Sequence, residues 1–193
     1  MAANKTKIVL GGKAFELLRL RGNNPQAKQL LGTHETRGRG HIGEEEPLTM
    51  LEWFMYESHA SSSYVDTFIK DEKAQVFFLV EKGKGAVGFF SILPGKETAE
   101  LGSLYLMKEY RHKSFGAELV ARSLRIARKS GFLKVRIPEM TDAMEISAMR
   151  AMKRMKKTWK TRKFKQVEPF GGPDLEIELH KRPNRRERRA ARR

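Results

Sequence analysis

Cysteine is absent from all 193 residues of the sequence. This absence excludes a disulfide framework, a thiolate zinc site and a cysteine nucleophile. Long apolar runs are also missing, since none approaches the ~20 residues that a helix needs to span a bilayer. Residues 1–7 lack the apolar stretch of a signal peptide. We therefore expect a soluble protein made in the cytoplasm.

Acidic residues are scarce relative to basic ones. The chain has 23 Asp and Glu against 39 Lys and Arg, which gives a formal net charge of +16. A surplus of this size indicates a polyanionic partner, such as DNA, RNA or an acidic membrane face, with a solubilising surface as the alternative. No metal site is expected, because no metal-ligand spacing is present among His34, His41, His59 and His180.

The N-terminal part gives a mixed pattern. Residues 7–10 fit a short strand, and residues 14–20 and 26–31 fit short helices separated by a Gly-Asn-Asn-Pro turn. Residues 36–40 read as a flexible basic loop. Three acidic residues and a proline then precede apolar residues at helical spacing, which predicts a helix over about 48–60.

Strand patterns begin at about residue 75. The apolar runs 76–80 and 86–93 flank a Lys-Gly-Lys-Gly turn, so they predict a hairpin. Residues 99–107 predict a third strand. The helix 116–130 follows, with one apolar stripe and one charged face. It leads to a strand over 133–137, and a helical crossover between strands implies that the two strands are parallel.

The C-terminal part predicts another helix over about 144–159, followed by strands at 164–167 and 175–179. Residues 182–193 are rich in arginine with almost nothing apolar, so they cannot bury enough surface to fold alone. Hydrophobic residues make up 39% of the chain, which is enough for the core of one domain. The fold class expected is α/β (α+β), a single domain with a basic tail.

A basic loop stands before the best-supported helix. Backbone amides at a helix N-terminus are unpaired and lie at the positive end of the helix dipole, which suits a pyrophosphate. A glycine there lets the backbone approach a ligand closely, and fixed cations add attraction. A solvated connection is the alternative. The loop consists of Arg111, His112, Lys113, Ser114, Phe115, Gly116 and Ala117.

The segment 99–117 resembles the central motif of the GNAT superfamily of N-acetyltransferases. The motif of that family has Arg or Gln, two variable residues, Gly, one variable residue, then Gly or Ala. Arg111 and Gly116 match it, whereas Ser114 replaces the first glycine and disfavours a positive φ. The resemblance implies a mixed, mostly antiparallel sheet and acetyl-CoA as cofactor. It also implies that Leu104 and Leu106 offer backbone groups to the cofactor, and that residues 111–117 surround its phosphates.

Acetyl transfer needs a base for the amine and an acid for the leaving thiolate. The resemblance gives Glu100 and Tyr105 as the candidates, with a surface or packing role as the alternative for each. The tyrosine that often serves the family as acid is replaced by Trp159, at the end of the predicted helix. An asparagine found seven residues earlier in the family is replaced by Met152.

Two functions therefore remain open. One is an N-acetyltransferase with acetyl-CoA as donor. The other is an inactive GNAT-fold protein that binds nucleic acid or serves a structural role, and the chain is similar in size and style to basic GNAT-like proteins inside phage virions, which would place it in a host cytoplasm or a virion. Nucleic-acid contact is expected through residues 150–165 and 182–193. The expected division is an N-terminal arm over 1–47, a GNAT-like domain over 48–181 and the tail.

Overall fold

The computed structural model describes residues 4–32, 49–111, 114–138, 142–154, 159–165 and 174–179. Within these ranges the strands form one mixed sheet of eight strands in the order β1-β2-β3-β4-β5-β6-β8-β7. The strands are β1 (Asn4–Leu10), β2 (Lys13–Arg21), β3 (Gln75–Glu81), β4 (Gly85–Pro94), β5 (Thr98–Leu106), β6 (Lys134–Ile137), β7 (Trp159–Lys165) and β8 (Asp174–Leu179).

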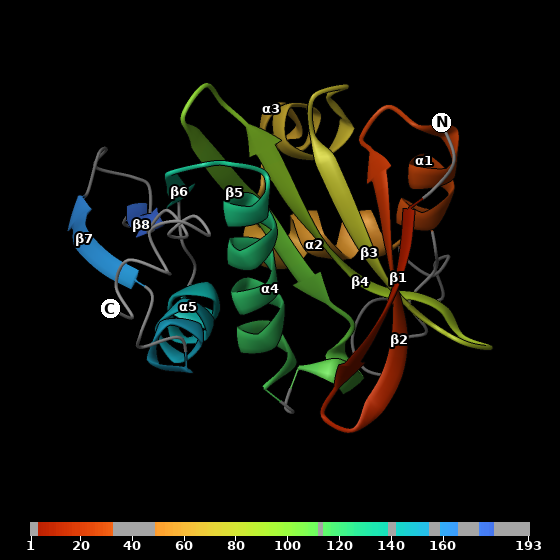
Figure 1. Ribbon diagram of the computed structural model, residues 1–193. Coiled ribbons are helices and arrows are strands. Elements are labelled where there is room, and N and C mark those ends of the chain that lie inside the picture. The colour runs from red at the N-terminus through yellow and green to blue at the C-terminus, as the bar shows by residue number, and fades with distance from the viewer. Residues whose placement is uncertain are drawn as a thin grey trace.

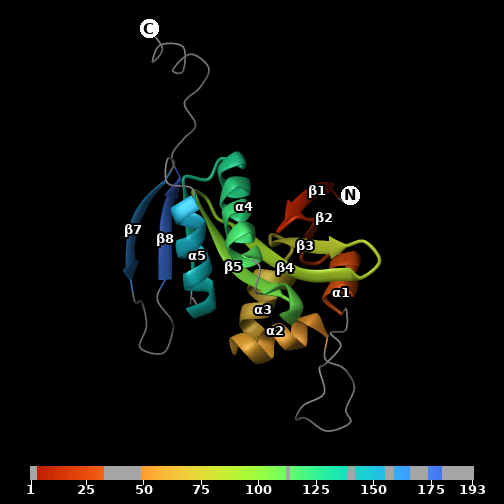
Figure 2. The same cartoon turned by 90° about the horizontal axis from the view of Figure 1, so that it is seen from below.

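Helices cover both faces of the sheet (Figure 1). One layer contains α4 and α5, and the opposite layer contains α1, α2 and α3, as the view from below shows (Figure 2). The helical elements are α1 (Pro25–Leu31), α2 (Met50–Ser58), α3 (Ser62–Val65), the π-helical turn η1 (Asp66–Lys70), the 3-10 turn η2 (Lys108–Tyr110), α4 (Phe115–Lys129) and α5 (Asp142–Arg154). This α+β architecture confirms the expected fold class.

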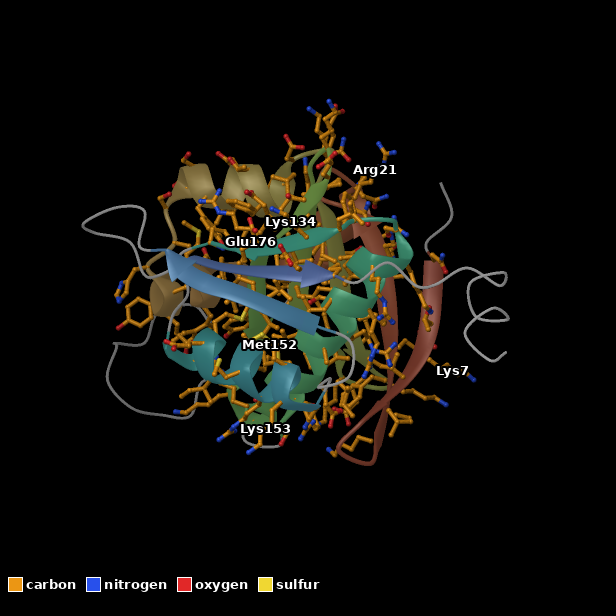
Figure 3. All side chains as sticks on the ribbon, turned by 60° about the vertical axis from the view of Figure 1, so that its left-hand side comes forward. Lys7, Arg21, Lys134, Met152, Lys153 and Glu176 are labelled. Atoms are coloured by element: carbon orange, nitrogen blue, oxygen red, sulfur yellow. The ribbon has the colours of Figure 1, made fainter. Side chains whose placement is uncertain are left out.

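The order of pairing follows the hydrophobic runs. β1 to β5 form an antiparallel meander, and the β3–β4 pair is the hairpin that the two apolar runs predicted. β5 and β6 are parallel, as the helical crossover through α4 implied. β8 then returns antiparallel to β6, where Lys134 and Glu176 form an ion pair of 3.1 Å across the two strands (Figure 3).

Helix α4 forms where the apolar stripe predicted it. Val120 and Leu124 are fully buried against the sheet, whereas Arg125 is exposed on the opposite face. The helix ends in a Schellman arrangement, because the Gly131 N–H donates to the Arg128 carbonyl at 3.1 Å and Gly131 has a φ of 93°. Glycine adopts this left-handed conformation without a steric penalty.

Two sequence-based predictions of helix were wrong. Residues 14–20 form strand β2, because Leu17 and Leu18 are both buried and the strand is therefore covered on both faces. Burial on both faces removes the alternation that distinguishes a strand from a helix. Trp159 begins strand β7 rather than ending a helix, since α5 stops at Arg154.

The N-terminal residues take part in the sheet. Residues 4–32, which lie in the segment expected to be an arm, form β1, β2 and α1, and β2 pairs with β3. Helix α2 confirms the helix predicted over 48–60 and begins at a capping box between Thr49 and Glu52. The basic loop 36–40 and the tail 182–193 lie outside the described residues.

Candidate functional site

Strands β5 and β6 pair over a short stretch and then separate. Their register ends at Glu100 opposite Arg136, whereas Ile137 at the end of β6 keeps only the pairing with Leu175 of β8 on the other edge of β6. A bulge at Gly102 accompanies the separation, because the register with β4 shifts between Ser91 and Ile92. The part of β5 beyond Glu100 therefore has one edge with no partner strand among the described residues.

A cavity of about 350 Å³ lies at this separation and receives residues from α2, β5, α4 and α5. We call it the first cavity. It brings together most of the residues that the sequence predicted, namely Leu104, Tyr105, Leu106, Arg111, Ser114, Gly116 and Ala117. Residues as far apart in sequence as Phe54 and Arg150, 96 positions, thus meet around one space.

The N-terminus of α4 supplies backbone donors to the first cavity. Its first internal hydrogen bond runs from the Glu118 N–H to the Ser114 carbonyl at 3.1 Å, so the amides of residues 115–117 precede the internal ladder. Ser114 adopts a φ of 61° and a ψ of 10°. The loop therefore takes the left-handed conformation that a glycine would favour, even though serine disfavours it.

Gly116 keeps this helix end open. A Cβ at Gly116 would lie 2.8 Å from the Ser147 hydroxyl oxygen of α5, so a larger residue would press on α5 and narrow the cavity. The side chain of Phe115, by contrast, points away from the cavity. It is fully buried and packs edge-on against Phe15 of β2, with ring centroids 5.7 Å apart. His112 and Lys113 lie outside the described residues.

Arg111 is held within the cavity wall by three groups. Its Nη1 and Nη2 lie 2.9 and 2.6 Å from the two carboxylate oxygens of Glu57 on α2, which makes a bidentate ion pair. Its Nε donates to the Leu106 carbonyl at 2.7 Å, and its guanidinium lies 5.2 Å from the ring centroid of Tyr105. The pair joins the start of the loop to the opposite helical layer, a link that sequence reasoning missed.

A second set of contacts fixes the turn just before the loop. The Tyr110 hydroxyl donates to the Glu81 carboxylate, and Lys84 donates to the same hydroxyl at 3.2 Å. The hydrogen bond from Tyr110, aided by Lys13 and Lys84, lowers the pKa of Glu81. Burial and the neighbouring carboxylate raise the pKa of Tyr110. The phenol is therefore a neutral donor that anchors the turn to the β3–β4 hairpin.

A second cavity of about 210 Å³ adjoins the first. The two cavities share Phe54, Ser58, Leu104 and Met144 in their walls. The second cavity extends past the bulge at Gly102 toward the junction of α2 and α3, where His59 lies in its wall. No signal in the sequence singled out this histidine. It has no regular spacing from the other histidines, and it lies 43 positions before Gly102.

One family of known proteins matches the sequence that forms this site. A model of the acetyltransferase (GNAT) family matches residues 45–155. The chain belongs to this family.

Solved GNAT structures resemble the chain in fold. An aminoglycoside 6′-acetyltransferase type Ii is 16% identical with a TM-score of 0.55, over 87% of this chain and 98% of that one. A GNAT-family acetyltransferase from Staphylococcus aureus Mu50 is 12% identical with a TM-score of 0.53, over 85% and 99% of the two chains. A search of curated protein sequences found no match.

Acetyl-CoA is the cosubstrate of the GNAT family, and the first cavity fits it. The open helix end has amides and a positive dipole to receive phosphate oxygens. Gly116 leaves room for close approach, since a Cβ there would already meet Ser147. The edge of β5 around Leu104, which has no partner strand among the described residues, has backbone groups that suit the amides of a pantetheine arm, whereas the Leu106 carbonyl is already bonded to Arg111.

The two candidate catalytic residues of this GNAT chain lie apart. Tyr105 is buried in the wall of the first cavity, edge-on to Phe54 with ring centroids 6.3 Å apart. Glu100 forms an ion pair of 3.3 Å with Arg136 and is not among the described residues that line either cavity. Met152 is half-buried on α5, and it too is not among the described residues lining either cavity.

Metal and membrane features are absent from the residues that the structure describes. No cluster of three or more His, Cys, Asp or Glu side chains there has the arrangement of a metal site. No helix in the same ranges is both long enough and apolar enough to cross a bilayer.

Proposed function

We propose that this protein is an N-acetyltransferase that moves an acetyl group from acetyl-CoA to a primary amine. The observation that carries the proposal is the meeting of the separated β5 edge with the open N-terminus of α4 in one cavity. Bound acetyl-CoA supplies an activated thioester. The protein supplies a site that holds the donor and places its reactive end near the second cavity.

Each part of the first cavity has a distinct task in this proposal. The amides of residues 115–117 hold the diphosphate, because they are unpaired donors at the positive end of a helix. The unpaired β5 edge orients the pantetheine arm. Tyr105, a residue of the first cavity wall, donates a proton to the leaving thiolate. Glu100 is engaged with Arg136, so the base for the amine is sought elsewhere.

Ligand-dependent stability tests the proposal. At acetyl-CoA concentrations about 100-fold above Kd, binding adds roughly 2.7 kcal/mol to the free energy of unfolding, which raises Tm by about 5–11 °C. We expect this shift for the unaltered protein. Gly116→Leu should lose most of it, because the side chain fills the helix end beside Ser147. Arg125→Leu, exposed on the same helix, is the matched control and should keep the full shift.

A turnover assay completes the test. Free CoA released from acetyl-CoA is measured with a thiol reagent in the presence of primary amines. Unchanged Tm with acetyl-CoA, together with no thiol release above the rate without protein, would contradict the proposal. A shift retained in Gly116→Leu would instead contradict the placement of the diphosphate at the α4 end.

We propose polyanion binding as a second function, because a net charge of +16 favours a polyanionic partner. Arg150 and Lys153 are exposed on α5, and Lys153 projects from the body of the molecule (Figure 3). Such binding weakens steeply with salt, as each neutralised phosphate releases counterions. DNA titrated at 50 and 200 mM salt should show this loss of affinity. Equal affinity at both concentrations would remove this function.

A further inference from the structure

The second cavity is a built polar site rather than a simple extension of the first. Its walls carry hydroxyl groups from α2, α3 and β5 beside the apolar side chains of Phe54, Ile137 and Met144. Among the described residues that line it, His59 is the one whose side chain carries a basic nitrogen.

His59 is held in place on both sides. It terminates α2 with a φ of 55° and a ψ of 25°, a left-handed conformation that non-glycine residues adopt uncommonly. Two residues later, Ser61 begins α3 by accepting a hydrogen bond from the Tyr64 N–H at 3.1 Å. The short connection between two capped helices therefore fixes the position of His59 at the wall of the cavity. Its side chain remains exposed, so it can exchange protons with solvent.

The bulged strand adds Ser103 to this wall. Ser103 lines the second cavity and is only 2% exposed, and its Oγ is closed to solvent with no hydrogen-bond partner among the described residues. Ser91, directly opposite it on β4, is in the same state. A ligand in the open cavity therefore does not reach either hydroxyl.

The charges around the cavity restrict the kind of amine. Tyr64 of α3 lines the same cavity as His59, and the described lining residues from β5, β6 and α5 are uncharged. Glu57, one residue before the end of α2, is already paired with Arg111. A second positive charge on the ligand would therefore find no counterion in the described lining. The apolar side chains of Phe54 and Met144 suit an alkyl chain instead.

We propose that the second cavity binds an aliphatic primary monoamine and that His59 is the catalytic residue that removes its proton. This inference rests on the proposed acetyltransferase function. The neutral imidazole takes one proton from R–NH3⁺. The amine nitrogen then attacks the acetyl carbonyl carbon, the C–N bond forms, and the C–S bond breaks with its electron pair on sulfur.

The protons balance in this sequence. The nitrogen loses a second proton as the amide forms. The thiolate takes a proton from the Tyr105 phenol, and the second proton from the nitrogen returns the Tyr105 phenolate to the phenol. The net products are the N-acetylated amine, CoA thiol and one proton. The exposed imidazole of His59 passes this proton to solvent.

His59→Asn is the variant that tests the assignment, because asparagine tolerates the left-handed conformation but cannot act as a base. We measure kcat/KM with acetyl-CoA and n-pentylamine by thiol release. We expect a loss of about 100-fold or more, in the range of general base catalysis. The acid-side decline of kcat/KM should also disappear. The Tm shift with acetyl-CoA should stay unchanged, which shows that the variant folds and binds the donor.

Ser62→Ala, at an exposed position at the start of α3, is the matched control and should match the unaltered protein. 1,5-Diaminopentane should be a poorer substrate than n-pentylamine by about ten-fold or more in kcat/KM. Activity of His59→Asn within three-fold of the unaltered protein would overturn the role of His59. Equal or better use of the diamine would overturn the monoamine class. If acetyl-CoA does not raise the Tm of the unaltered protein, the proposed function itself is refuted.

Discussion

The ion pair between Arg111 and Glu57 should contribute measurably to stability and to donor binding. Each side chain is about one-third exposed, at 32% and 34%. Two unit charges about 4 Å apart attract by roughly 4 kcal/mol at an effective dielectric constant of 20. Partial exposure offsets most of this through solvation and screening, so about 1 kcal/mol is expected to remain for a bidentate pair.

A double-mutant cycle isolates this interaction. Glu57→Gln, Arg111→Met and the double variant are unfolded in urea at low salt, and the coupling free energy is the departure from additivity. The hydrogen bond from Arg111 to the Leu106 carbonyl is lost in both variants that carry Arg111→Met, so it cancels from the coupling free energy. We expect a coupling of about 1 kcal/mol, which falls as salt is added.

The same free energy limits the effect on the ligand. If the pair holds α2 against the loop, Glu57→Gln should weaken acetyl-CoA binding by at most about five-fold, the equivalent of 1 kcal/mol. A coupling below about 0.3 kcal/mol would refute the reasoning, because it would mean that the two side chains act independently. Tighter acetyl-CoA binding by Glu57→Gln would show that the carboxylate competes with the phosphates for Arg111.

Three further predictions concern stability. Leu124→Ala, at a fully buried position on α4, should lower the free energy of unfolding by about 2–5 kcal/mol in urea titrations. The pKa of Glu81 is lowered from 4.5, chiefly by the Tyr110 hydrogen bond, so its stabilisation is present above pH 4.5 and is lost as the pH falls through the lowered value. Tyr110→Phe should therefore lose less stability than the unaltered protein between pH 5 and acid pH, and an equal loss would contradict this role. Gly102→Ala should destabilise by about 1–3 kcal/mol, because its Cβ would overlap the Phe68 ring.

Local pattern was sufficient for helix α4, which buries one face, and for the β3–β4 hairpin, whose continuous apolar runs flank a clear turn. The helix beginning near Gly116 and the hairpin around the Lys-Gly-Lys-Gly turn follow from apolar spacing and turn chemistry alone, and both are confirmed. The loop at Arg111 was found for the same reason, because its glycine and its place before a helix are features of neighbouring residues. The prediction failed at Leu17 and Leu18, where both faces of a strand are buried.

The residues predicted for the site also fall into those that local sequence placed correctly and those that it did not. Ser114 and Gly116 reach the cavity because they belong to the helix end itself. Phe115 was predicted to contact phosphates from its place in the loop, but its side chain enters the core beside Phe15, exactly one hundred positions away in sequence. Helical geometry turns neighbouring side chains in different directions, and only packing decides which of them reaches the ligand.

By itself, the sequence determined helix α4, the β3–β4 hairpin and the loop that precedes the N-terminus of α4. Tertiary structure alone decided which side chains face one another. Arg111 meets Glu57 across 54 positions, and His59 reaches the wall that Ser103 completes from β5. Periodicity records that a side chain is buried or exposed, whereas the partner it meets depends on how distant segments pack.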